Sequence, residues 1–151
     1  MRTLGNIIWH IPFLGFLSAF FTFLFGGLLV LTVVGAPIGL GLIQLAKFLL
    51  SPFSSKMISK DDLNVQQNQA WKAYGLIIRI LYIPFGVVMS IVVMFQTIAM
   101  FVSIVGIPVA VVLAKSLPTY FNPVNKICVS SHVADELSRQ KAQEYIARKR
   151  G

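Results

Sequence analysis

The sequence predicts an all-α membrane protein made of two tandem parallel repeats, each a long transmembrane helix, a Gly-x-Pro break and a shorter return helix. Hydrophobic residues are 56% of the 151 positions and charged residues only 12%, about half of the charge found in soluble domains. Residues 11–53 and 80–121 contain a single lysine each. Residues 35–59 also return, 71 positions later, as residues 106–130.

The internal similarity organises the whole chain, and self-similarity at a fixed offset is the signature of a repeat architecture. The matched positions include Gly35 with Gly106, Pro37 with Pro108 and Pro52 with Pro123. Upstream, residues 11–13 match residues 83–85 at an offset of 72. We therefore expect a first membrane repeat (1–59), a polar cytoplasmic linker (60–73), a second membrane repeat (74–130) and a basic, helical cytoplasmic tail (131–151).

The long spans are expected at residues 13–34 and 85–105. The first has 22 uncharged residues, about 33 Å of helix and enough for one crossing. Pro12 would fall in the first turn of the first helix, where proline is tolerated. Trp9 is expected at the membrane interface with its ring buried and its N–H in water. The first apolar run is too long for a cleaved signal peptide.

Each long span is followed by a helix break, at Gly35 and Pro37 in the first half and at Gly106 and Pro108 in the second. Proline clashes with the preceding helical turn, so the chain should bend there. The return limbs, 38–50 and 109–121, have 13 residues each, about 20 Å against a hydrocarbon core of about 30 Å. Such a limb is either a thin, tilted crossing or a half-helix that rests on other helices. The breaks themselves are either binding sites or turns at the far interface.

The polar segments should lie on one side of the membrane. A short interfacial helix ending at Tyr82 would place Arg79 among headgroups. In the tail, Val133, Leu137 and Tyr145 share one face of an expected amphipathic helix, which would either pack on the protein or lie on anionic lipid. The positive-inside rule puts the N-terminus, linker and tail in the cytoplasm and both breaks toward the far side, so the repeats would be parallel about an axis along the membrane normal.

The chain resembles the YccF-type small inner-membrane proteins of bacteria over nearly its whole length. The residues that carry this resemblance are Met1-Arg2-Thr3 with Asn6-Ile7, Gly35-x-Pro37 with Lys47 and Pro52-Phe53, Asp61-Asp62-Leu63-Asn64, and Gly106-Ile107-Pro108-Val109 with Lys115 and Pro123-Val124. Ala110, Ser54 and Asn125 depart from it, because family members usually have glycine there. The resemblance implies an inner-membrane location and topology, and no activity.

Lys47 and Lys115 are the sharpest site candidates, because ionisable residues within apolar helices are costly and often functional. They would contact a pore or lipid headgroups, with Gln44 and Gln96 as further contacts. The alternatives are that the lysines reach the interface with their long stems and that the polar side chains join helices.

No sequence pattern of a hydrolase, metalloprotease, nucleotide-binding loop or redox enzyme occurs, so we expect a protein that is not an enzyme and holds no cofactor or metal. The net charge of +8 is explained by topology and anionic lipid headgroups rather than by nucleic acid. The first functional hypothesis is a homo-oligomeric channel or transporter for ions or small solutes in the lipid bilayer. The alternative is a membrane scaffold or accessory subunit that recruits partners through the linker and tail.

Overall fold

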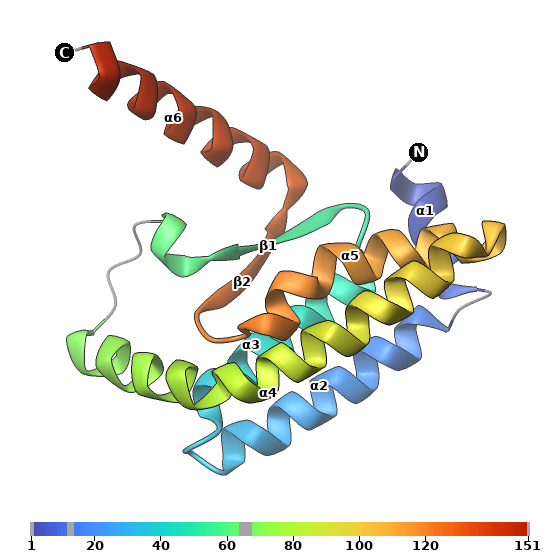
Figure 1. The fold of residues 1–151 in the computed structure, drawn as a ribbon, viewed down its shortest axis with the longest axis horizontal. Helices are drawn as coiled ribbons and strands as arrows, with labels where there is room; N and C mark the ends of the chain where they lie inside the picture. The colour runs from blue at the N-terminus through green and yellow to red at the C-terminus, as the bar shows by residue number, and fades with distance from the viewer. Residues whose placement is uncertain (1, 12–13, 64–67, 151) are drawn as a thin grey trace.

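The computed structural model describes residues 2–11, 14–63 and 68–150. Figure 1 shows a helical body with a two-stranded ladder on one side and a C-terminal helix that projects away from it. The elements in chain order are α1 (Arg2–His10), α2 (Gly15–Leu31), α3 (Ala36–Leu50), β1 (Ser55–Ser59), the 3-10 helix η1 (Lys60–Leu63), α4 (Gln69–Val102), the 3-10 helix η2 (Ile104–Gly106), α5 (Ile107–Phe121), β2 (Lys126–Ser130) and α6 (Ser131–Arg150).

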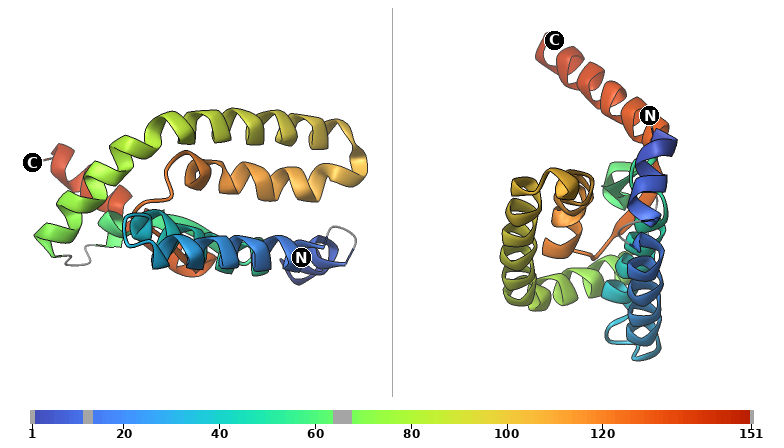
Figure 2. Two further views of the ribbon diagram at one scale, coloured as in Figure 1. Left: turned by 90° about the horizontal axis from the view of Figure 1, so that it is seen from below. Right: turned by 90° about the vertical axis from the view of Figure 1, so that its right-hand side faces the viewer.

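Two helical hairpins, α2 with α3 and α4 with α5, form the body (Figures 1 and 2). Glycines let the helices of each hairpin approach closely. A Cβ atom on Gly39 would lie 2.5 Å from the carbonyl oxygen of Gly26, and one on Gly86 would lie 2.2 Å from that of Phe121. Small residues at such contacts are typical of helix packing within membranes.

The helices have the length and composition of a membrane protein. Within the described residues, Gln69–Val102 and Ile104–Phe121 are long and apolar enough to cross a bilayer, and Ala36–Leu50 is a shorter apolar helix. Large apolar side chains of α2 and α4 are exposed along most of their length. In water that surface would be unfavourable, whereas hydrocarbon solvates it. The predicted all-α membrane class therefore fits, with one short ladder added.

The second long helix does not begin at Phe85, after a separate interfacial helix ending at Tyr82, as predicted. Helix α4 starts at Gln69, where the Asn68 side chain accepts a hydrogen bond from the backbone N–H of Ala70 at 3.2 Å, and it continues through Pro84 to Val102. Proline removes one backbone hydrogen bond, a loss that packing against a neighbouring helix can offset in membrane proteins. Part of the predicted linker 60–73 is thus helical, at η1 and at the start of α4. Pro12 lies outside the described residues.

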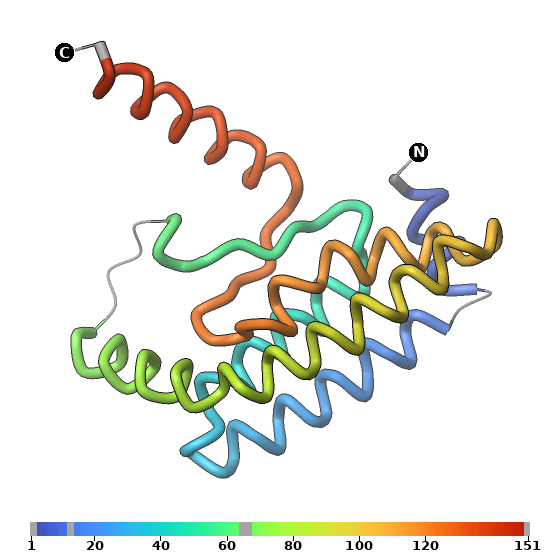
Figure 3. The backbone as a smooth tube through the Cα atoms, in the orientation of Figure 1, coloured from blue at the N-terminus to red at the C-terminus, as the bar shows by residue number. Residues whose placement is uncertain are grey.

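Strands β1 and β2 were not predicted from the sequence. They pair antiparallel (Figure 3), with Ser55 opposite Ser130, Met57 opposite Cys128 and Ser59 opposite Lys126. At one end of the ladder the N–H of Lys60 donates to the carbonyl of Asn125, and at the other the N–H of Ser131 donates to that of Ser54, each at 2.9 Å. The two bonds occupy equivalent positions in the two halves, because Lys60 corresponds to Ser131 and Ser54 to Asn125 at the offset of 71 residues.

The two hairpins run in opposite directions, which contradicts the predicted parallel arrangement. Gly41, near the start of α3, packs on the end of the second hairpin: its Cβ would lie 1.9 Å from the carbonyl oxygen of Pro123. Conversely, Lys115 of α5 reaches Pro52, just beyond the end of α3. Helices α3 and α5 are therefore antiparallel, and Figure 2 shows the turns of the two hairpins at opposite ends of the body. Charge counting could not detect this, because it assumes that every long helix stands upright.

The core lies between α1, α3 and α5, around Leu45, Phe48 and Val112, each fully buried. Trp9 belongs to this core and is only 5% exposed, and its indole N–H donates to the carbonyl of Leu49 at 2.8 Å. The ring is buried as predicted, but the prediction that the indole N–H faces water is wrong. A protein carbonyl, instead of water, accepts the indole hydrogen bond that a buried tryptophan requires.

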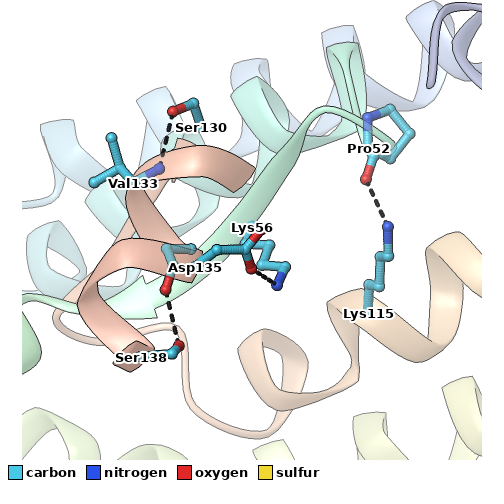
Figure 4. Close-up of polar contacts among 8 residues, drawn as sticks. Pro52, Lys56, Lys115, Ser130, Val133, Asp135 and Ser138 are labelled. Carbon is cyan, nitrogen blue, oxygen red and sulfur yellow. Dashed lines mark hydrogen bonds and ion pairs between the residues drawn. The ribbon is translucent and has the colours of Figure 1, made fainter. Parts of the chain in front are cut away.

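The tail forms the predicted helix, α6, but through different contacts. Lys56 of β1 pairs with Asp135 at 2.7 Å, and Lys141 pairs with Asp62 of η1; Figure 4 shows the first of these. Val133 and Tyr145, expected on the apolar face of an amphipathic helix, are exposed, so they do not pack on the protein. Ion pairs to the ladder and η1, instead of an apolar face, therefore hold the first half of α6 while the rest extends outward.

Candidate functional site

The four residues predicted to contact a pore or lipid headgroups do not form one site. The side-chain oxygen of Gln44 accepts a hydrogen bond from the backbone N–H of Cys128 at 3.2 Å. The Lys115 ammonium donates to the carbonyl oxygen of Pro52 at 3.2 Å (Figure 4). It also lies 5.2 Å from the centre of the Phe53 ring. Both side chains therefore stabilise the tertiary structure by holding a strand or turn against a helix.

Lys47 and Gln96 are exposed on α3 and α4. The glycines of the two breaks stand immediately before helices, Gly35 at the start of α3 and Gly106 at the start of α5. Because the hairpins are antiparallel, these breaks lie at opposite ends of the body and form no common site.

A different set of residues converges on a cleft of about 280 Å³. The cleft opens where α3, η1, the first turns of α4 and the turn between α5 and β2 meet. Its basic side chains are Lys60, Lys72, Arg79 and Lys126. Its apolar lining residues are Pro37, Leu40, Gly41, Gly75, Leu76 and Val124. The cleft thus combines cationic and apolar side chains.

Hydrogen bonds fix the turn that forms one wall of the cleft. Asn125 has φ 64°, a left-handed conformation that asparagine tolerates better than most residues. Its side-chain amide donates to the Asp61 carboxylate at 3.0 Å, and its carbonyl accepts from the N–H of Lys60 at 2.9 Å. Asn125 stands where the resemblance to YccF-type proteins leads us to expect glycine. It therefore supports the same left-handed turn, and its side chain ties that turn to η1.

Helix α4 supplies the opposite wall. Lys72 and Arg79 are seven residues apart, two helical turns, and therefore share one face. Trp71 also lines the cleft and is 40% exposed. Gly75, between the two cations, leaves room above Val124, whose side chain lies 3.6 Å from where its Cβ would be. The first turns of α4 thus present two cations and an indole to the same space.

The electrostatic balance of the cleft favours an anion. Among its described lining residues, Asp61 is the only carboxylate beside the four cations, and the Asn125 amide already engages it. Lysine and arginine are the side chains that bind phosphate, lysine as a point charge and arginine through a planar fork of donors. The arrangement can therefore hold a phosphate next to an apolar group.

The equivalent position in the first half is filled by protein. Under the shift of 71 residues, Phe53 corresponds to Val124. The Phe53 ring lies 2.8 Å from where a Cβ on Gly5 would be, and Asn6 donates to the Ser54 hydroxyl at 3.1 Å while accepting from the N–H of Phe53. The smaller valine in the second half leaves the space open. Among the described residues, the cleft therefore lies beside Val124, and the equivalent space beside Phe53 is occupied.

A comparison with protein-family models locates the recognisable part of the chain. Residues 4–55 match the YccF model, described as an inner membrane component domain. The match covers about a third of the chain and lies wholly in the first half. No curated protein and no solved structure matches significantly. With the two span-length apolar helices, this YccF match supports an inner-membrane location.

Arg79 was expected at the headgroups from the sequence, but the cleft itself was not predicted. Lys60 and Lys72 were assigned to a linker, and Lys126 was given no role. The signal that could have pointed to the cleft is the seven-residue spacing of Lys72 and Arg79 beside Trp71 on an amphipathic helix. Lys60 and Lys126 could not be added to it without the strand pairing that places η1 beside the turn after α5.

Proposed function

We propose that this membrane protein binds the phosphate-bearing headgroup of an anionic lipid in the cleft and acts as a scaffold or accessory subunit. The observation that carries the proposal is the convergence of four basic side chains on a partly apolar cleft of about 280 Å³. Pockets for drug-sized ligands measure about 300–1,000 Å³. A cleft of this size suits a headgroup and the first atoms of the acyl chains, with the rest of the lipid outside.

The energetics of lysine and arginine near anionic lipid support a measurable preference. Each such residue contributes about 1 kcal/mol near the surface of an anionic membrane, a value that falls with salt. Replacing three of the four should therefore weaken binding by about 100-fold.

Helix α6 supports the scaffold role. It projects from the body in Figure 1 and exposes most of its length, including Tyr145 and Ile146. In the orientation expected from charge, both termini and α6 are cytoplasmic, where a partner could contact them. A homo-oligomeric channel draws less support, because Gln44 and Lys115 are engaged by the backbone of Cys128 and Pro52.

Tryptophan emission tests the proposal directly. Purified protein in a zwitterionic detergent is titrated with short-chain phosphatidylglycerol, short-chain phosphatidylcholine or inorganic phosphate. We expect saturable binding of phosphatidylglycerol, weaker binding of phosphate and none of phosphatidylcholine. The emission change should survive Trp9→Phe and disappear with Trp71→Phe, because only Trp71 lines the cleft.

The matched variants separate the cleft from general charge. Lys60→Gln/Lys72→Gln/Lys126→Gln should weaken binding by about 100-fold. The control, Arg139→Gln/Arg148→Gln/Lys149→Gln, removes the same charge from α6 and should change affinity less than about 3-fold, because those residues lie outside the cleft. Equal losses in both triple variants would refute the proposal, and phosphate binding as tightly as the lipid would assign the cleft to a free anion. Solute flux through proteoliposomes that depends on Lys47 or Lys115 would favour the channel.

A further inference from the structure

The charged ladder lies alongside the middle of the two short helices. Gln44, halfway along α3, bonds the backbone of Cys128 at the centre of β2. Strand β1 runs back along α3, because its end at Ser59 lines the same cleft as Pro37 at the start of that helix. The Lys56 to Asp135 ion pair therefore lies beside the helices and not beyond their ends (Figures 1 and 4).

An upright pose, with α3 and α5 along the membrane normal, would put this ladder within the hydrocarbon. Helix α3 has 15 residues, about 22 Å, so its middle would lie near the bilayer centre. Open edges of a two-stranded sheet do not occur in contact with lipid hydrocarbon, because their backbone N–H and C=O groups would lack partners. Charged side chains there add a further cost of about 2.5–3.5 kcal/mol each on insertion scales.

The connection between the hairpins gives the same result independently. Because α3 and α5 are antiparallel, α3 ends at one end of the body and α4 begins at the other. Tyr74, near the start of α4, bonds the carbonyl oxygens of Val33 and Val34 in the turn before α3. In an upright pose the polar chain that leaves α3 at Ser51 and enters α4 at Asn68 would have to cross the bilayer, and its described part holds only β1 and the four-residue η1. Only helices and closed barrels can do so.

The two hairpin turns expose large apolar side chains. Leu31 and Val33 in the first turn are 79% and 72% exposed, and Val102 and Ile104 in the second are 83% and 85% exposed. No charged residue stands within eight positions of either turn. Both turns need an apolar surrounding, although they lie at opposite ends of the body.

We infer that both hairpins enter the bilayer from the side that carries the ladder, and that neither turn emerges on the opposite face. The ladder, the basic cleft and α6 then face one aqueous phase. A local twofold axis that relates the two halves passes between Met57 and Cys128 at the centre of the ladder. This axis lies near the membrane normal, and the two hairpins lie obliquely in the leaflet beneath the ladder. The occupant of the exposed apolar surface is lipid. This replaces the hairpins with turns on the far side of the membrane, and so up to four crossings, that the sequence predicts, and it does not depend on what the cleft binds.

Single cysteines test this topology in full-length protein in its native membrane. In a Cys128→Ser background, Thr32→Cys and Ser103→Cys mark the two turns, Ser130→Cys marks the ladder and Gln143→Cys marks α6. A membrane-impermeant maleimide is applied to intact spheroplasts and to inverted vesicles. We expect the ladder and α6 positions to react from the same side only, and both turns to react at least 10-fold more slowly than Gln143→Cys from either side.

A nitroxide spin label on the same cysteines reports directly whether each position lies in hydrocarbon or in water. Its collision rate with oxygen should exceed that with a water-soluble nickel chelate at both turns, and the reverse should hold at Gln143. Labelling of both turns from the side opposite α6 would restore the four-crossing pose, and labelling of one turn from each side would establish the upright antiparallel pose. A ladder position that is unreactive from both sides, in a variant that elutes as a single peak in detergent, would mean that a second copy covers it. Each of these three results would overturn the inference.

Discussion

Met57 and Cys128 face each other at the centre of the ladder and stand 71 residues apart. The Cys128 N–H bonds Gln44 and not Met57, so these two residues form a non-hydrogen-bonded pair of the antiparallel ladder. In such a pair the Cα atoms are about 4.5 Å apart and the side chains point to the same face. The offset that relates the halves in sequence thus coincides with the centre of the strand pairing.

A disulfide tests this register. Met57→Cys should form a disulfide with Cys128 under mild oxidation, because the Cα separation of a non-hydrogen-bonded pair suits the bond. Non-reducing electrophoresis and mass spectrometry would detect it. Burial raises the pKa of the Cys128 thiol, so the thiolate fraction is small at neutral pH and the reaction should accelerate as the pH is raised.

Ile58→Cys is the matched control, since the neighbouring residue points to the other face of β1 and pairs with Ile127. It should cross-link at least 10-fold more slowly. Faster cross-linking of Ile58→Cys would mean that the strands are shifted by one residue, which moves every side chain to the opposite face.

Gly41→Ala should destabilise the contact between the hairpins. A Cβ there would lie 1.9 Å from the carbonyl oxygen of Pro123, and backbone cannot move away as a side-chain tip can. Overpacking of this kind costs about 1–3 kcal/mol. Thermal unfolding in detergent, followed by circular dichroism, should show a lower midpoint.

Gly27→Ala provides the comparison, because nothing lies within 4 Å of where its Cβ would be and the residue is also helical. Alanine is the better helix former by about 1 kcal/mol, so this variant should be as stable as the wild type or more so. If Gly41→Ala were equally well tolerated, the close antiparallel packing of α3 on the second hairpin would be wrong.

The attachment of α6 should depend on salt and on acid. The hydrogen bond from Lys141 lowers the pKa of Asp62 below its ordinary value of 3.8. A lowered carboxyl pKa contributes stability that is present above the ordinary value and lost as the pH falls through the lowered one. Amide exchange in α6 should therefore be constant from neutral pH down to the ordinary carboxyl range, after intrinsic rates are corrected, and accelerate below it.

Asp62→Asn should speed exchange in α6 by up to about 5-fold, as expected for the loss of one exposed ion pair, and 1 M salt should act similarly. Glu136→Gln removes an α6 carboxylate outside the two ion pairs and should have little effect. An equal response to both substitutions would assign the attachment of α6 to something other than these pairs.

Lys115 and Lys47 should differ in stability although they are the same residue type on equivalent short helices. Lys115→Met removes the ammonium that binds the Pro52 carbonyl and lies over Phe53, and should cost about 1 kcal/mol. Lys47 is exposed, so Lys47→Met should cost almost nothing. Chemical denaturation in mixed micelles would measure both, and a larger loss for Lys47→Met would contradict the assigned contacts.

The sequence alone indicated that most of this protein lies in hydrocarbon, and it gave the positions of the two short helices α3 and α5. Missing charge over long stretches indicates hydrocarbon around the chain, and glycine and proline stop or start helices through local backbone sterics. Those effects act within a few residues, so α3 and α5 could be placed from Gly35 and Gly106 without knowledge of the rest. The helical tail followed from local patterning in the same way.

Only the tertiary structure decided how the halves meet. Strand pairing between residues 55–59 and 126–130 depends on contacts across 71 positions, and no local pattern in these short polar segments encodes a partner. That pairing sets the two hairpins antiparallel, brings Lys60 and Lys126 to the same cleft as Lys72 and Arg79, and carries the charged ladder over the middle of α3 and α5. The site and the mode of membrane insertion follow from it, because a charged ladder must stay in water whatever the helices beside it prefer.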